Sequence, residues 1–85
     1  MYPIPRNLPN LNRAAIDKLS RREIRVFELI GVGTGRQDMA EIIGVKVGTG
    51  DVFRARIKAK LNLRSARDLR WTAIRWINWK LVSHS

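Results

Sequence analysis

Hydrophobic residues recur along the chain three or four positions apart, in four successive segments. This spacing places them on one face of an α-helix, so each segment predicts a helix with a buried side. The predicted helices cover residues 20–30, 36–43, 47–61 and 66–80, and together they predict an all-α, compact four-helix domain. Their apolar faces comprise Val26, Phe27 and Ile30; Met39, Ala40, Ile42 and Ile43; Phe53, Ile57 and Leu61; and Ala66, Leu69, Ala73, Ile77 and Leu81.

Polar residues mark where two of these helices begin. Ser20 and Glu23 have the spacing of a capping box, in which the serine oxygen accepts from a backbone N–H group and the glutamate reaches back. Ser65 and Asp68 repeat that spacing before the last helix. Leu19, directly before the first cap, is placed to act as a hydrophobic staple.

Glycines mark the turns. Gly31 and Gly33 predict the end of the first helix, and Gly44 predicts the end of the second. Gly48 and Gly50 lie in the first turn of the third helix, where each lowers helix propensity by up to about 1 kcal/mol relative to alanine. We therefore expect this turn to be loose or to begin late.

The N-terminal segment differs from the rest of the chain. Its first ten residues contain all three prolines, which predict an extended arm or linker. Residues 11–19 predict a short helix or turn, with Leu11, Ile16 and Leu19 packing on the core. The expected divisions are an arm at 1–18, the helical domain at 19–80 and a tail at 81–85.

Composition excludes several classes of protein. The 85 residues suffice for one domain. The chain has no cysteine, and its single histidine, His84, has no neighbouring partner, so the sequence predicts no enzyme, metal site or cofactor. No apolar run approaches the roughly 18 residues of a membrane span, and the N-terminus lacks the apolar stretch of a signal peptide. We expect a cytoplasmic protein without a membrane partner.

The positive charge is concentrated in one region. The net charge is +10, and residues 46–70 carry eight basic residues against Asp51 and Asp68. Such a block is typical of a surface that binds phosphates, although a merely solvated helix face has the same composition. A basic helix that follows a glycine turn is the arrangement by which helix-turn-helix proteins place a helix in the DNA major groove.

Three stretches carry a family resemblance: L-S-x-R-E-x-x-V-F-E-L-I from Leu19, G-x-G-R-Q-D-M-A-E-I-I-G-V from Gly33, and R-x-R-I-K-A-K-L-N-L-R-S from Arg54. Together they resemble the LuxR-type (GerE- or NarL-type) helix-turn-helix domain, as far as about Ile74. The resemblance implies a bacterial, DNA-binding, transcription-regulating module that commonly forms dimers through its fourth helix. The matching positions are Leu19, Ser20, Arg22, Glu23, Val26, Ala40, Gly44, Thr49, Ile57, Lys60 and Leu61.

The third helix departs from the family pattern more than the scaffold does. The family usually has serine at Lys46, valine at Gly50, a basic or polar residue at Asp51 and histidine at Phe53. The outward face of this helix is predicted to approach the bases and its basic flanks the phosphates of double-stranded DNA. The predicted DNA-binding residues are Lys46, Thr49, Asp51, Val52, Arg54, Ala55, Arg56, Lys58, Lys60 and Arg64, with Gly48 and Ala59 on the same outward face.

Asp51 has three open interpretations. It accepts a hydrogen bond from a base, for which cytosine N4 is the natural donor; it caps the loose first turn of the third helix; or it repels DNA.

The last helix has a second apolar face. Trp71, Trp79 and Val82 lie roughly opposite the predicted core stripe, which predicts a homodimer through this helix. Two alternatives to a sequence-specific regulator remain. One is a degenerate helix-turn-helix module that binds another regulator or RNA polymerase and touches DNA weakly. The other is a cationic architectural protein with little sequence preference.

Overall fold

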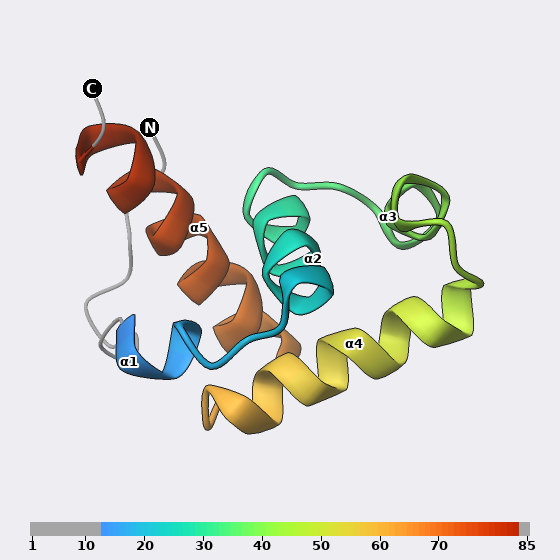
Figure 1. Ribbon diagram of the computed structural model, residues 1–85, viewed down its shortest axis with the longest axis horizontal. Coiled ribbons are helices and arrows are strands. Elements are labelled where there is room, and N and C mark those ends of the chain that lie inside the picture. The colour runs from blue at the N-terminus through green and yellow to red at the C-terminus, as the bar shows by residue number, and fades with distance from the viewer. Residues whose placement is uncertain (1–12, 84–85) are drawn as a thin grey trace.

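The computed structural model describes residues 13–83, which form five helices joined by short turns (Figure 1). The predicted all-α fold is confirmed, and each of the four predicted helices is present. A single helical turn precedes them, within the segment where a short helix or turn was expected. The helices are α1 (Arg13–Ile16), α2 (Arg21–Gly31), α3 (Arg36–Ile43), α4 (Val47–Lys60) and α5 (Ala66–Ser83). Most of the predicted N-terminal arm lies outside the described residues, and so does Leu11.

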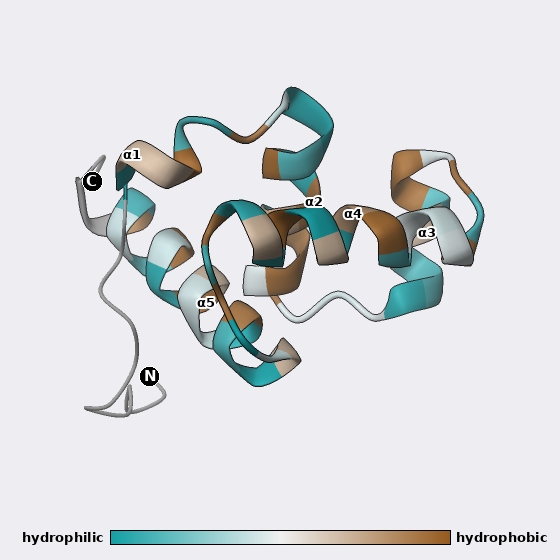
Figure 2. Ribbon diagram, turned by 90° about the horizontal axis from the view of Figure 1, so that it is seen from below, coloured by the Kyte–Doolittle hydropathy of each residue, from teal (hydrophilic) through white to brown (hydrophobic). Residues whose placement is uncertain are grey.

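Helix α2 is the centre of the packing. It lies side by side with α5 and also contacts α4, while α3 packs on the N-terminal part of α4 (Figure 1). Val26 and Phe27 of α2 have no exposed surface, and Ile57 of α4 and Leu69 of α5 are equally buried. Ile16 of α1 closes the core, as predicted. In Figure 2, α5 carries hydrophilic residues along much of its length, with short hydrophobic stretches between them.

The predicted helix signals are confirmed. Ser20 Oγ accepts from the Glu23 N–H group at 3.1 Å, and Glu23 Oε1 accepts from the Ser20 N–H group at 2.8 Å, which completes the capping box. Ser65 Oγ accepts from the Asp68 N–H group at 3.0 Å. Gly44 ends α3 with φ of 81°, a left-handed conformation that glycine adopts without steric cost.

Gly31 does more than end a helix. It lies in the last turn of α2, where the backbone of α5 approaches closely. A Cβ atom at this position would lie 2.6 Å from the carbonyl oxygen of Ala73. The contact between α2 and α5 therefore requires glycine here.

α4 begins at Val47, as predicted, and includes Gly48 and Gly50, so its first turn does not begin late. Three residues of the predicted apolar faces are exposed, among them Ala66 at the start of α5. Leu81, predicted to face inward, is 67% exposed because α5 extends past the end of α2 (Figure 1). Ile42 is 49% exposed because the short α3 packs through its neighbours on the adjoining face, Met39 and Ala40.

The core face of α5 differs from the predicted stripe in one position. Leu69 and Ala73 are buried as expected, but the next residue that packs on the core is Trp76, where Ile77 was expected. Trp76 was not predicted as a core residue. Because small and large residues alternate along α5, its sequence is compatible with more than one buried face. Packing against the neighbouring helices determines which face is buried.

Candidate functional site

Helix α4 presents one side to the core and the other to solvent. Gly50 and Ile57 are buried, and Phe53 packs partly buried against the same core. The opposite side is a strip of small or apolar residues, of which Val52 is 48% exposed. We call this strip the outer strip of α4; it consists of Gly48, Val52, Ala55 and Ala59, all exposed. The strip matches the outward face predicted from the sequence, except for Asp51.

Basic residues lie on both flanks of the outer strip. Arg56 is exposed on one flank, and Lys58 is partly exposed on the other. Lys46 and Thr49, at the start of α4, are exposed, and so is Arg64 in the turn after it. These side chains are therefore open to a partner that approaches α4 from the solvent side.

Asp51 is bound by an arginine from the preceding helix. Arg36, the first residue of α3, donates from Nε to Oδ1 at 3.0 Å and from Nη2 to Oδ2 at 2.5 Å. The hydrogen bonds from Arg36 hold the pKa of the Asp51 carboxyl group below its ordinary value. Desolvation opposes this lowering, and the charges of Arg36 and Arg54 add to it. Asp51 lies beyond the first turn of α4, which contains no acidic residue, so the capping interpretation was wrong.

Lys60 is engaged within the chain. Its Nζ atom lies 2.6 Å from Oε1 of Glu23, whose side chain is almost completely buried. Burial raises the pKa of Glu23, but the hydrogen bonds from Lys60 and Ser20 outweigh it and the net effect is a lowered pKa. Lys60 thus compensates a buried carboxylate, a role that its position in the basic block did not indicate.

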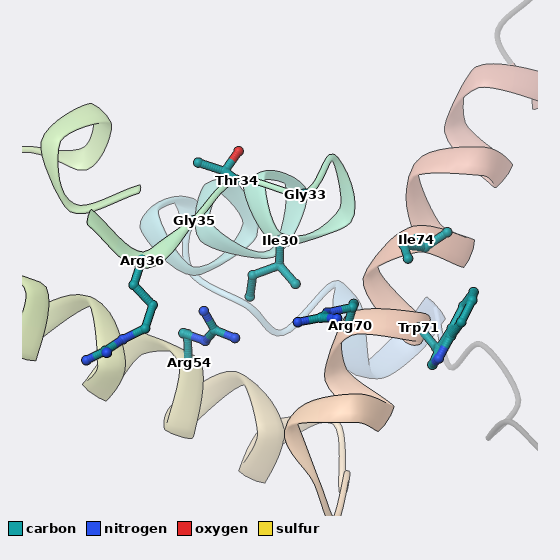
Figure 3. Close-up of a pocket in the computed structure, with 9 residues that line it drawn as sticks. All are labelled: Ile30, Gly33, Thr34, Gly35, Arg36, Arg54, Arg70, Trp71 and Ile74. Atoms are coloured by element: carbon teal, nitrogen blue, oxygen red, sulfur yellow. The ribbon is translucent and has the colours of Figure 1, made fainter. Parts of the chain in front are cut away.

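A hollow beside α4 gathers three arginines from three helices. Its volume is about 610 Å³, and Figure 3 shows Arg54 of α4 and Arg70 of α5 pointing toward one another below Ile30. Arg36 lines the same hollow but is turned toward Asp51. Within residues 13–81, neither Arg54 nor Arg70 has a carboxylate at ion-pair distance. This flank of α4 is therefore strongly positive.

The tryptophans of α5 have separate surroundings. Trp79 stacks on Trp76 with ring centroids 5.2 Å apart, and the guanidinium carbon of Arg13 lies 3.9 Å from the Trp79 ring centroid. Trp71 is on another side of α5, partly exposed at the rim of the hollow. The structure thus separates two residues that the sequence analysis assigned to one face. The side chain of Val82 lies outside the described residues.

Two further properties bear on the class of site. None of the helices in residues 13–83 is long and apolar enough to cross a membrane. The described part of the chain also contains no group of three or more histidine, cysteine, aspartate or glutamate side chains placed to hold a metal ion.

Comparison with known proteins gives one family. The family model described as "Bacterial regulatory proteins, luxR family" matches residues 17–73. The oxygen regulatory protein NreC of Staphylococcus epidermidis is 41% identical over 51 residues, which are 60% of this chain and 23% of NreC. NreC of Staphylococcus carnosus is 39% identical over 51 residues, again 60% of this chain and 24% of the relative.

A second kind of relative matches over a stretch of the same length. The transcriptional regulatory protein TdiR of Thauera aromatica is 33% identical over 51 residues, 60% of this chain and 22% of TdiR. The chain therefore spans about a quarter of the length of the curated relatives it matches. No solved structure matches the chain.

Proposed function

The chain belongs to the luxR family of bacterial regulatory proteins, and on this premise we propose that it binds a specific DNA sequence by placing α4 in the major groove. It would regulate transcription in this way. The family is a DNA-binding helix-turn-helix family, and α3 and α4 are the two helices of that motif. The choice of α4 as the helix that contacts bases, and of particular contact residues, is our proposal.

The observation that carries this proposal is the outer strip of α4 with its basic flanks. The major groove admits an α-helix, and a strip of small side chains allows the helix backbone to come close to the base edges. Val52 and Ala55 are suited to contact thymine methyl groups. Arg56 and Lys58, one on each flank, are suited to bind the phosphates of the two strands.

The remaining basic residues divide into two groups. Lys46, Arg54 and Arg64 have no carboxylate at ion-pair distance among the described side chains, and we propose them as further phosphate contacts. Lys60 is the weakest of the predicted contacts, because its ammonium group is held by Glu23. The small outer strip leaves few side chains for direct recognition of bases, so much of the selectivity would come from DNA shape.

We further propose that two copies associate through α5. Trp71 supports this, since it is a large aromatic side chain that the chain itself leaves partly exposed. Trp79 is a weaker candidate than the sequence indicated, because its ring already contacts Arg13 and Trp76. For Val82 the proposal rests on the sequence pattern alone.

Asp51 favours a second candidate function. A carboxylate on the DNA-contacting helix is unfavourable beside phosphates, which suits a family member that has lost strong DNA binding. Such a protein would bind another regulator or RNA polymerase instead. The two candidates differ in their affinity for duplex DNA and in its dependence on salt.

The test is a titration of fluorescently labelled duplexes, random in sequence or selected for binding, over a series of salt concentrations. If about five phosphates are neutralised, log K should fall with log salt at a slope near −4 to −5. Arg56→Ala should weaken binding to all sequences alike and reduce the magnitude of the slope by roughly one. Arg25→Ala, which removes an exposed arginine from α2, is the matched control and should change the slope less.

Either of two results would reject the proposal. One is the absence of binding to any duplex at low salt, which would favour the protein-interaction module. The other is salt-dependent binding without any preference between selected and random duplexes, which would favour a non-specific architectural protein.

A further inference from the structure

The ion pair between Arg36 and Asp51 joins the two helices of the helix-turn-helix unit. Arg36 is the first residue of α3, and Asp51 lies fifteen positions later, on the flank of the outer strip of α4. Both oxygens of the carboxylate accept from the same guanidinium group. This paired geometry fixes the direction of the carboxylate as well as compensating its charge.

The exposure of the pair argues against a role in stabilising the fold. The side chains of Arg36 and Asp51 are 60% and 43% exposed. Ion pairs this open to water contribute little to stability, because solvent screens them and two long side chains lose freedom. A role at the surface, where α4 meets its partner, explains the pair better.

Asp51 presents an electrostatic difficulty for DNA binding. The sequence of α4 contains one acidic residue, and it is this one. An uncompensated carboxylate on the flank of a helix in the major groove would be repelled by the nearby phosphates. Arg54, three residues further along α4, adds a favourable charge but points into the hollow toward Arg70 and gives Asp51 no hydrogen bond (Figure 3).

We propose that Arg36 is a positioning residue for DNA binding: it holds the Asp51 carboxylate against α3, neutralised and directed away from the bases, so that the outer strip of α4 can enter the groove. The proposal rests on the proposed function. It replaces the two remaining interpretations of Asp51: the carboxylate neither contacts a base nor repels DNA while Arg36 is present.

The test compares the wild type with Arg36→Gln, Asp51→Asn and the double variant, on one duplex selected for wild-type binding. Arg36→Gln releases the carboxylate and should weaken binding by roughly tenfold or more, because a like charge is left facing the phosphates. Asp51→Asn alone should change affinity by less than about threefold and leave sequence preference unchanged. The double variant has the net charge of the wild type and should recover to within about threefold of it.

Arg56→Gln, with and without Asp51→Asn, is the matched control. It also removes one positive charge from the same surface, but Arg56 is on the other flank of α4 and does not contact Asp51. Asp51→Asn should therefore rescue Arg36→Gln and fail to rescue Arg56→Gln. Circular dichroism should show that every variant is folded at the assay temperature, since both members of the pair are exposed.

Three results would overturn this inference while leaving DNA binding itself intact. If the double variant is as weak as Arg36→Gln, then Arg36 contacts a phosphate directly. If Asp51→Asn relaxes preference at one base pair, the carboxylate contacts a base. If Asp51→Asn rescues Arg56→Gln equally well, the effect is one of net charge and not of the pair. Failure of the wild type to bind any duplex would instead reject the proposed function.

Discussion

Glu23 is a buried acidic side chain whose charge is compensated from two directions. Its carboxylate accepts from the backbone N–H group of Ser20 as part of the capping box, and from Lys60 of α4. The first contact is local and was predicted from the spacing of Ser20 and Glu23. The second joins residues 37 positions apart. The carboxylate therefore links the start of α2 to the end of α4, and Lys60 holds the two helices together.

We expect Lys60→Ala to destabilise the fold at neutral pH. Removing the ammonium group leaves a buried carboxylate with only the hydrogen bond from the Ser20 N–H group, which should cost about 1–3 kcal/mol. The lowered pKa of Glu23 means that the charged group stabilises the fold above its ordinary pKa of 4.5, and that this contribution is lost as the pH falls through the folded value. The loss caused by Lys60→Ala should therefore shrink in acid. Urea unfolding at about pH 7 and about pH 3 measures both effects.

Lys58→Ala is the control for this prediction. Lys58 is on the same helix but has no carboxylate at ion-pair distance among the described residues. Its removal should change the free energy of unfolding by less than about 0.5 kcal/mol at either pH. An equal loss in both variants, or a loss in Lys60→Ala that persists unchanged in acid, would show that the Glu23 pair is not what stabilises this contact.

At the scale of the helices, two glycines inside helices have opposite roles. Gly31 lies where α2 meets the backbone of α5, and a Cβ atom there would also come within 2.6 Å of the Ile77 side chain. Gly50 is buried in α4, yet a Cβ atom there would meet nothing within 4 Å. One glycine is required by packing between helices, and the other only lowers the propensity of α4 to form.

We therefore expect Gly31→Ala and Gly50→Ala to change stability in opposite directions. Gly31→Ala must push α2 away from α5 and should cost about 1–3 kcal/mol. Gly50→Ala gains helix propensity without a clash and should stabilise the protein by up to about 1 kcal/mol. Chemical denaturation of the two variants beside the wild type measures the difference. If Gly31→Ala were neutral, the close contact between α2 and α5 would not exist in solution.

For the whole molecule, the question is what covers α5. This helix extends beyond α2 (Figure 1), and Trp71 is only partly covered by its own chain. Trp79 is also partly exposed, but Arg13 and Trp76 contact its ring. Substitution of Trp71 should therefore change self-association, and substitution of Trp79 should change the free energy of unfolding.

We expect sedimentation to show a concentration-dependent dimer that Trp71→Ala weakens. Burial of an aromatic side chain is worth about 1.5–3 kcal/mol, which corresponds to roughly a ten- to hundredfold change in Kd. Trp79→Ala should mainly lower the free energy of unfolding, because it removes contacts within the chain. Val32→Ala removes a 64% exposed apolar side chain from the end of α2 and is the control. A strict monomer at high concentration would reject the dimer.

The sequence by itself determined the helices and most of their ends. The capping box of Ser20 and Glu23, the left-handed Gly44 and the apolar spacing of α2 are properties of residues within one or two turns of one another. Local hydrogen bonding and helical periodicity are therefore enough to predict them. The luxR family and the position of the basic helix also followed from the order of residues along the chain, because the matching residues keep fixed spacings.

Only the tertiary structure decided which charges meet and which aromatic residues have partners within the chain. Arg36 binds Asp51, Lys60 binds Glu23 and Arg13 contacts the Trp79 ring, and in each case the partners belong to different helices. Helical periodicity fixes the face on which a residue lies. It leaves free the angle and distance between helices, which packing around Val26, Phe27 and Gly31 sets. Contacts between distant residues depend on that geometry. The basic block in the sequence therefore located the positive charge but did not show which basic side chains form ion pairs.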